Sequence, residues 1–152
     1  MLERTEMQEI VLTFAEPAEE EAIRKLLIDA DLPAEDFARH LQHFLVAKQS
    51  GALIGVIGLE SYGEFGLLRS LVVALPYRGQ GFGQKLCERV FSYARELGIK
   101  ELYLLTTTAE KFFSKLGFNM IDRNNVSAPI QATEEFSSIC PSTAVCMAKK
   151  LG

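Results

Sequence analysis

The sequence predicts an α/β fold, a mixed sheet with helices on both faces, and two pairs of neighbouring strands carry the prediction. An apolar strand over Leu67–Val73, an amphipathic helix over Gly81–Leu97 and a strand over Glu101–Thr106 form a crossover, which implies parallel pairing and a right-handed connection. Gly51 turns the chain between strands at Phe44–Gln49 and Ala52–Leu59, which implies antiparallel pairing. A sheet with both kinds of pairing is mixed.

The first third of the chain predicts a strand, a helix and a second short helix. Ile10–Phe14 alternates as a strand does. Pro17, followed by three glutamates, opens a helix to about Ala30. Pro33 and the pattern that follows it up to Phe44 suggest the second helix.

After the crossover, turn and cap residues delimit the elements. Gly98 ends the long helix, and Thr108 is placed to cap a helix that stops at Gly117. The last two strands are expected at Phe118–Ile121 and Thr143–Lys149.

The connection Asp122–Pro141 is longer than a hairpin needs. Pro129 and the run Thr133-Glu134-Glu135 can start a short helix within it. Long connections in compact domains are often functional, and a decorative insert is the alternative.

Composition describes an ordinary globular chain. The 152 residues, 48% hydrophobic and 24% charged, fit one domain over 1–152, with residues 1–8 expected as a mobile tail. Sixteen basic and twenty acidic residues give a net charge of −4, which argues against nucleic-acid binding. Apolar runs are too short for a membrane span and the N-terminus has no signal-peptide pattern, so we expect a cytoplasmic protein without a membrane partner.

The three cysteines predict neither a disulfide framework nor a metal site. Cys87, Cys140 and Cys146 are odd in number, irregularly spaced, and include no Cys-x-x-Cys pair. Reduced thiols are the expected state.

A glycine-rich turn between the first strand of the crossover and its helix is the most informative motif. In Arg78-Gly79-Gln80-Gly81-Phe82-Gly83 the glycines leave the backbone bare where a helix presents its free N–H groups, which favours a bound phosphate. The turn fits neither the P-loop nor the Rossmann fingerprint. It fits the pattern Arg/Gln-x-x-Gly-x-Gly/Ala.

Together with a second block, this turn resembles the GNAT superfamily of N-acyltransferases. Ala109-Glu110-Lys111-Phe112-Phe113-Ser114-Lys115-Leu116-Gly117-Phe118 is similar to the family's Ala-x-x-Phe-Tyr-x-x-x-Gly-Phe helix and turn, in the expected order. The resemblance implies a GNAT fold and an N-acetyltransferase that uses acetyl-CoA and a small-molecule amine acceptor, as a monomer or homodimer. The implied cofactor-binding residues are Leu71, Val72, Val73, Arg78, Gly79, Gln80, Gly81, Phe82, Gly83, Gln84, Thr106, Thr107, Phe112 and Phe113.

The chain departs from the family pattern at the catalytic acid and base. The family's tyrosine acid corresponds to Phe113, which has no hydroxyl, and Thr106 replaces a common asparagine. The strand position of the usual base falls on Leu67, so Glu60 and Glu64, the nearest carboxylates along the chain, are the candidate catalytic residues. Each is also explained as a solvated surface acid.

Arg69 interrupts an apolar strand, which is costly for a guanidinium unless it meets an anion. A structural salt bridge to a glutamate and a substrate carboxylate both explain it. The second reading agrees with a closer resemblance, carried by Leu67–Val73, Glu101–Thr108 and Glu135–Pro141, to the arsenic-resistance branch of GNAT enzymes. That branch acetylates glutamate analogues such as arsinothricin or phosphinothricin, and implies acceptor contacts from Arg69, Ser70, Ser138 and Cys140.

Two other functions fit the same residues. A protein or peptide N-acetyltransferase would need an open groove, whereas the long connection after Asp122 is suited to enclosing a small ligand. A non-catalytic acyl-CoA-binding module would explain Phe113 and the missing strand glutamate.

Overall fold

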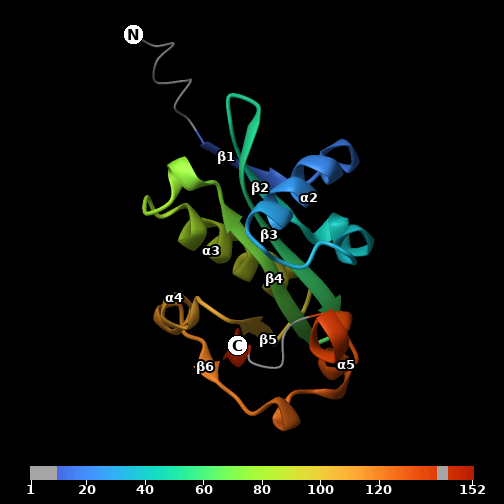
Figure 1. Ribbon diagram of the computed structural model, residues 1–152. Coiled ribbons are helices and arrows are strands. Elements are labelled where there is room, and N and C mark those ends of the chain that lie inside the picture. The colour runs from blue at the N-terminus through green and yellow to red at the C-terminus, as the bar shows by residue number, and fades with distance from the viewer. Residues whose placement is uncertain (1–9, 140–143) are drawn as a thin grey trace. The chain divides into compact units, whose positions relative to one another are not determined.

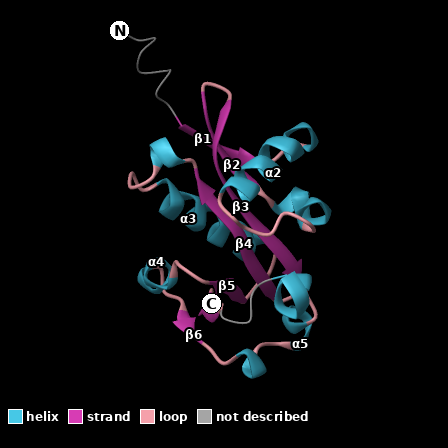
Figure 2. Cartoon of the chain, in the orientation of Figure 1, coloured by secondary structure: helices cyan, strands magenta, loops and turns pink. Residues whose placement is uncertain are grey.

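The computed structural model describes residues 10–139 and 144–152, without the side chains of 138 and 139, and Figures 1 and 2 show the course of the chain. The predicted tail at residues 1–8 therefore lies outside the described residues. The strands are β1 (Ile10–Phe14), β2 (Leu45–Gln49), β3 (Ala52–Tyr62), β4 (Phe65–Val73), β5 (Glu101–Thr106), β6 (Asn119–Met120) and β7 (Val145–Lys150). The α-helices are α2 (Glu20–Asp29), α3 (Phe82–Glu96), α4 (Glu110–Lys115) and α5 (Ala128–Gln131). The 3-10 helices are η1 (Pro17–Glu19), η2 (Phe37–His43), η3 (Leu75–Tyr77) and η4 (Arg123–Asn125), and η5 (Glu135–Ile139) is a π-helix.

The strands form a seven-stranded mixed sheet in the order β1-β2-β3-β4-β5-β7-β6. β1 with β2, β2 with β3, β5 with β7 and β6 with β7 pair antiparallel, whereas β4 and β5 pair parallel. The mixed sheet predicted from the crossover and the hairpin is confirmed.

The chain divides into two compact units. Of the described residues, 10–58 and 70–90 form the first unit, and 59–69, 91–139 and 144–152 form the second. Each unit has its own apolar core.

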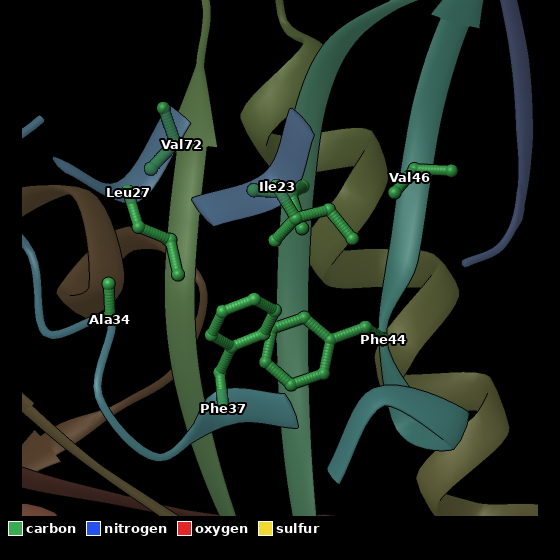
Figure 3. Packing of buried hydrophobic residues seen from close by; sticks show 8 residues of the cluster. Ile23, Leu27, Ala34, Phe37, Phe44, Val46 and Val72 are labelled. Atoms are coloured by element: carbon green, nitrogen blue, oxygen red, sulfur yellow. The ribbon is translucent and has the colours of Figure 1, made fainter. Parts of the chain in front are cut away.

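In the first unit, α2 packs on one face of the strands. Its core consists of Ile23, Leu27, Ala34, Phe37, Phe44, Val46, Val56 and Val72. Figure 3 shows the rings of Phe37 and Phe44 together, with centroids 5.7 Å apart, close to Ile23 of α2. A Cβ on Gly58 would lie 2.3 Å from the Phe44 ring, so this strand position has room only for glycine.

The other face of the same strands meets α3. A Cβ on Gly55 would lie 3.2 Å from the Leu86 side chain, and Gly55 precedes Val56 of the α2 core. Because successive strand residues point to opposite faces, α2 and α3 cover opposite faces of this unit's strands.

In the second unit, α5 packs on one face of β5. Tyr103 packs with Leu67 and with Ile130 of α5 on one face. Gly66 precedes Leu67, and Leu102 precedes Tyr103, so both point to the opposite face. A Cβ on Gly66 would lie 2.9 Å from the Leu102 side chain and 3.0 Å from that of Ile99. Helices on both faces, as predicted, are thus present on the strands of the first unit, and α5 covers one face of the second.

Several predicted boundaries need correction. β3 continues to Tyr62 and β4 begins at Phe65, because Gly63, with a φ of 68°, allows a tight turn between them. The second helix is the 3-10 helix η2.

The long connection contains the short helix that Pro129 indicated, because α5 has this proline in its first turn. The run Thr133-Glu134-Glu135 leads into the π-helix η5, where an ordinary helix was expected. Thr133 sits between the two helices, where its hydroxyl donates to the Ile130 carbonyl at 2.8 Å and its side chain is buried. Within residues 10–139 and 144–152, no helix combines the length and hydrophobicity that a membrane crossing requires.

Candidate functional site

The glycine-rich turn lies in the first unit and opens α3. Gly79 and Gly81 have φ angles of 79° and 88°, which side-chain-bearing residues rarely adopt, and nothing lies within 4 Å of a Cβ built on either. The first helical bond runs from Lys85 N to Gly81 O at 3.1 Å. The amides of Phe82, Gly83 and Gln84 therefore have no intrahelical acceptor, and the turn is an open seat for an anion.

Side chains of the turn hold its backbone in place. Arg78 Nε donates to the Val73 carbonyl at 2.7 Å, and Gln80 Nε2 donates to the Pro76 carbonyl at 3.2 Å. Both bonds tie the turn to the end of β4 and to the residues after it.

β4 bends at Ser70. This serine has a φ of 62°, which is uncommon outside glycine and fits a strand bulge. The parallel register of β4 with β5 covers Phe65–Leu67 against Glu101–Tyr103. The sequence could not show such a bend, because a single serine in an apolar strand is not specific for a bulge.

A buried ionic cluster, which we call the Arg69 cluster, lies in the second unit. It consists of Arg69, Glu60, Tyr62 and Glu135. Arg69 Nη1 lies 2.6 Å from Glu60 Oε2, and Arg69 Nε lies 3.2 Å from Glu135 Oε2. Tyr62 donates its hydroxyl to the other oxygen of Glu60.

The three charged side chains of this cluster are almost fully excluded from solvent. The exposed fractions are 0% for Arg69, 1% for Glu60 and 5% for Glu135. A guanidinium stays charged when buried, so it needs carboxylates at its edges. The salt bridge that the sequence left open for Arg69 is present, and it involves two glutamates.

The two candidate bases lie in different surroundings. Glu60 belongs to the Arg69 cluster, whereas Glu64 lies in the turn after β3, where its side chain is 64% exposed and 3.5 Å from Lys100 Nζ. The structure therefore brings Glu60, and not Glu64, together with Arg69.

The residues after β5 make local contacts. Thr106 Oγ1 accepts from the amides of Ala109 at 3.0 Å and Thr108 at 3.4 Å, so Thr106 holds the start of α4 in place of the predicted Thr108. Thr107 is exposed. The Phe113 ring is buried against Phe112 and Phe118, with centroids 5.1 and 5.6 Å away.

Two predicted acceptor residues are not fully described. Cys140 lies outside the described residues, and Ser138 belongs to η5 without a described side chain. Glu135 and Tyr62 were not foreseen as site residues. The one signal for them was Arg69 itself, because a cation in an apolar strand requires carboxylates from elsewhere.

Both described cysteines are buried, free thiols. Burial raises the pKa of Cys87 to about 12 and that of Cys146 to about 11, so both are protonated at neutral pH.

The second unit has a pocket of about 400 Å³, and no residue of the Arg69 cluster lines it. It is lined by Glu101, Gly117, Asn119, Met120, Ile121, Ala148 and Lys150. None of the predicted cofactor or acceptor residues is among them.

Comparison with known proteins decides the family. The model of the acetyltransferase (GNAT) family matches residues 5–118, which include the glycine-rich turn and the Phe112–Phe118 block. The chain belongs to the acetyltransferase (GNAT) family. The superfamily inferred from the two motifs is thereby confirmed.

Relatives of this GNAT chain include amino-acid acetyltransferases. It is 35% identical over 82 residues to the amino-acid acetyltransferase of Ralstonia nicotianae, a match that covers 53% of the chain and 18% of the relative. An uncharacterised N-acetyltransferase of Chlorobaculum tepidum is 30% identical over 90 residues, covering 59% of the chain and 57% of that protein. The chain thus spans only part of the length of these relatives.

A solved structure supports the GNAT fold. N-acetylglutamate synthase from Neisseria gonorrhoeae, complexed with coenzyme A and N-acetyl-glutamate, aligns with a TM-score of 0.83 at 18% identity. The alignment covers 95% of this chain and 35% of the synthase chain.

Proposed function

We propose that this protein transfers the acetyl group of acetyl-CoA to the amine of a small acidic amino acid, or of a glutamate analogue such as arsinothricin or phosphinothricin. The observation that carries the proposal is Arg69, a cation buried among carboxylates in the second unit. Its guanidinium is suited to an acceptor carboxylate. The names of the relatives, amino-acid acetyltransferase and N-acetylglutamate synthase, agree with such an acceptor.

The glycine-rich turn is the proposed seat of the cofactor's pyrophosphate. The amides of Phe82, Gly83 and Gln84 lack intrahelical acceptors, and the positive end of the α3 dipole favours an anion there. Leu71–Val73, beyond the bend at Ser70, are proposed to pair with the pantetheine arm. Arg78, through its bond to the Val73 carbonyl, would hold these two parts of the site in register.

The proposed reaction is a direct transfer. The acceptor amine forms the new C–N bond at the thioester carbonyl, the C–S bond breaks, and the amine proton passes to a base. Of the two candidates, the geometry favours Glu60, because it is the one that contacts Arg69. Phe113 has no proton to give, so the departing thiolate, a good leaving group, takes its proton from water.

A non-catalytic acyl-CoA-binding module is the second candidate function. The specific observation in its favour is Phe113, which is buried among aromatic rings where a relative with a catalytic acid carries a hydroxyl. A peptide acceptor is the remaining alternative within the enzyme class.

Release of coenzyme A from acetyl-CoA tests the proposal. The purified protein is screened against amino acids, their phosphinic and arsenic analogues, polyamines and peptides. Turnover confined to acidic amino acids or their analogues supports the proposed acceptor. Turnover with peptides supports the peptide alternative, and tight cofactor binding without turnover on any class supports the binding module.

A further inference from the structure

The two carboxylates of the Arg69 cluster are held in different ways. Glu60 lies on β3 and Arg69 on β4, which a tight turn joins, and Glu60 also accepts from Tyr62. The Arg69–Glu60 contact, at 2.6 Å, is therefore fixed within one hairpin. Glu135 comes from the separate connection between β6 and β7, and lies at 3.2 Å from Arg69 Nε.

The first part of that connection is firmly anchored. Val126 and Ile130 are buried in the core of the second unit. The Gln131 side chain donates to the carbonyls of Arg123 at 3.1 Å and Val126 at 2.8 Å. These contacts hold α5 in place.

The part that carries Glu135 has a different conformation. η5 is a π-helix, a rare form that is frequent at functional sites. Its neighbour Phe136 is half-buried, with the Arg123 guanidinium 6.0 Å from its ring centroid. Thr133 lies between α5 and η5, and its carbonyl accepts from the Ser137 amide at 3.0 Å. Displacement of Glu135 therefore requires a local rearrangement of η5.

We propose that Glu135 occupies the place of the acceptor's carboxylate on Arg69, and that an acidic acceptor displaces it. Both ligands present the same group to the same Nε–H edge of the guanidinium, so the exchange leaves the buried charge balance unchanged. While no acceptor is bound, Glu135 supplies the anion that the buried cation requires.

This exchange makes Glu135 a specificity-determining residue. An acceptor without a carboxylate leaves Glu135 on Arg69, whereas an acidic one competes with it. The apparent affinity for an acidic acceptor is lowered by the fraction of time that Glu135 holds the position. The inference rests on the proposed function, since it requires an acceptor that carries a carboxylate.

Glu135→Gln tests the exchange, with Glu134→Gln as the matched control. Glu134 is the exposed neighbour, so its substitution removes the same charge from the same segment. We expect E135Q to lower the KM for L-glutamate about three- to tenfold, because a neutral amide competes less well for Arg69. The KM for acetyl-CoA stays unchanged, and E134Q behaves as the wild type.

Two analogues of L-glutamate identify which of its carboxylates binds Arg69. L-glutamine and L-isoglutamine each lack one of the two carboxylates of L-glutamate. We expect the gain in E135Q to vanish for the analogue that lacks the carboxylate bound by Arg69, and to persist for the other. An equal gain for both analogues would overturn the exchange.

The results of these assays distinguish a failure of the exchange from a failure of the proposed function. If the wild type turns over no acidic amino acid or analogue, the proposed function fails and the exchange fails with it. If it does, but folded E135Q shows an unchanged or higher KM, the exchange alone is wrong. Should E135Q fail to fold, hydrogen exchange of the wild type with coenzyme A decides: L-glutamate must speed exchange of the amides at 135–137, and unchanged or slower exchange overturns the displacement.

Discussion

At the residue scale, two positions stand out: Arg69, which carries a buried charge, and Gly81, which has no side chain in the glycine-rich turn. Arg69 is a fully buried cation, stabilised by carboxylates at two edges of its guanidinium. Removing one partner of such a group is costly, because a buried charge is left without compensation. Gly81 is unusual for the opposite reason, because it leaves open space where a side chain would stand.

Arg69→Lys tests the acceptor role while it keeps the charge. Lysine lacks the planar fork that binds two carboxylates at once, so we expect the KM for an acidic acceptor to rise about tenfold or more. The dissociation constant of coenzyme A, measured by calorimetry, should change much less. An equal loss for both ligands would refute the acceptor role.

Gly81→Glu tests the phosphate seat, with Gly81→Ala as its control. Both variants carry the strain of a positive φ, about 1 kcal/mol, but only glutamate adds negative charge beside the free amides of α3. We expect G81E to weaken coenzyme A binding about a hundredfold or more, and G81A far less. Retained affinity in folded G81E would show that the cofactor binds elsewhere.

At the element scale, β4 has to serve several purposes along one strand. Its first residues pair with β5, Arg69 enters the ionic cluster, and Ser70 bends the backbone before the proposed pantetheine strand. The bend requires a residue in the left-handed region, where a β-branched side chain is strongly disfavoured.

Ser70→Val measures the strain of this bend. Alanine at the same position removes the hydroxyl but keeps an unbranched Cβ, so it serves as the reference. We expect valine to lower the free energy of unfolding by about 1–2 kcal/mol more than alanine does. Equal stability in urea unfolding would mean that the bend relaxes at little cost.

At the scale of the whole molecule, each of the two units has its own core, and each unit contains a buried, protonated thiol. Cys87 lies in the first unit and Cys146 in the second. The pKa of each is raised above its ordinary value of 9.0, to about 12 and about 11, by burial. Above pH 9 the unfolded chain loses protons that the folded chain retains.

The expected consequence is a loss of stability in alkali. Stability is fully present below pH 9 and falls as the pH rises from there toward the folded pKa values, by about 1.4 kcal/mol per pH unit for each thiol. Unfolding in urea at pH 8, 9 and 10 measures the slope. Cys87→Ala and Cys146→Ala should each make it shallower, and a slope that neither variant changes would contradict the assignment.

Much of the fold could be predicted from local pattern. Proline, glycine and alternating residues placed most elements within a few residues of their observed bounds, because these signals act through near neighbours in the chain. The predictions were wrong at two places, the start of α4 and the segment after Thr133. Thr106, and not Thr108, accepts from the first amides of α4, and the chain after Thr133 forms the π-helix η5 where an ordinary helix was expected.

The sequence by itself determined the family, the mixed sheet and the glycine-rich turn, because motifs, spacing and periodicity are written in consecutive residues. Only the tertiary structure decided which carboxylates pair with Arg69. A buried cation must find anions, but which carboxylates reach it depends on a hairpin and on a connection sixty-odd residues further along, and such distances in sequence leave no local trace. The positive φ of Ser70 likewise has no signal in the apolar strand pattern around it.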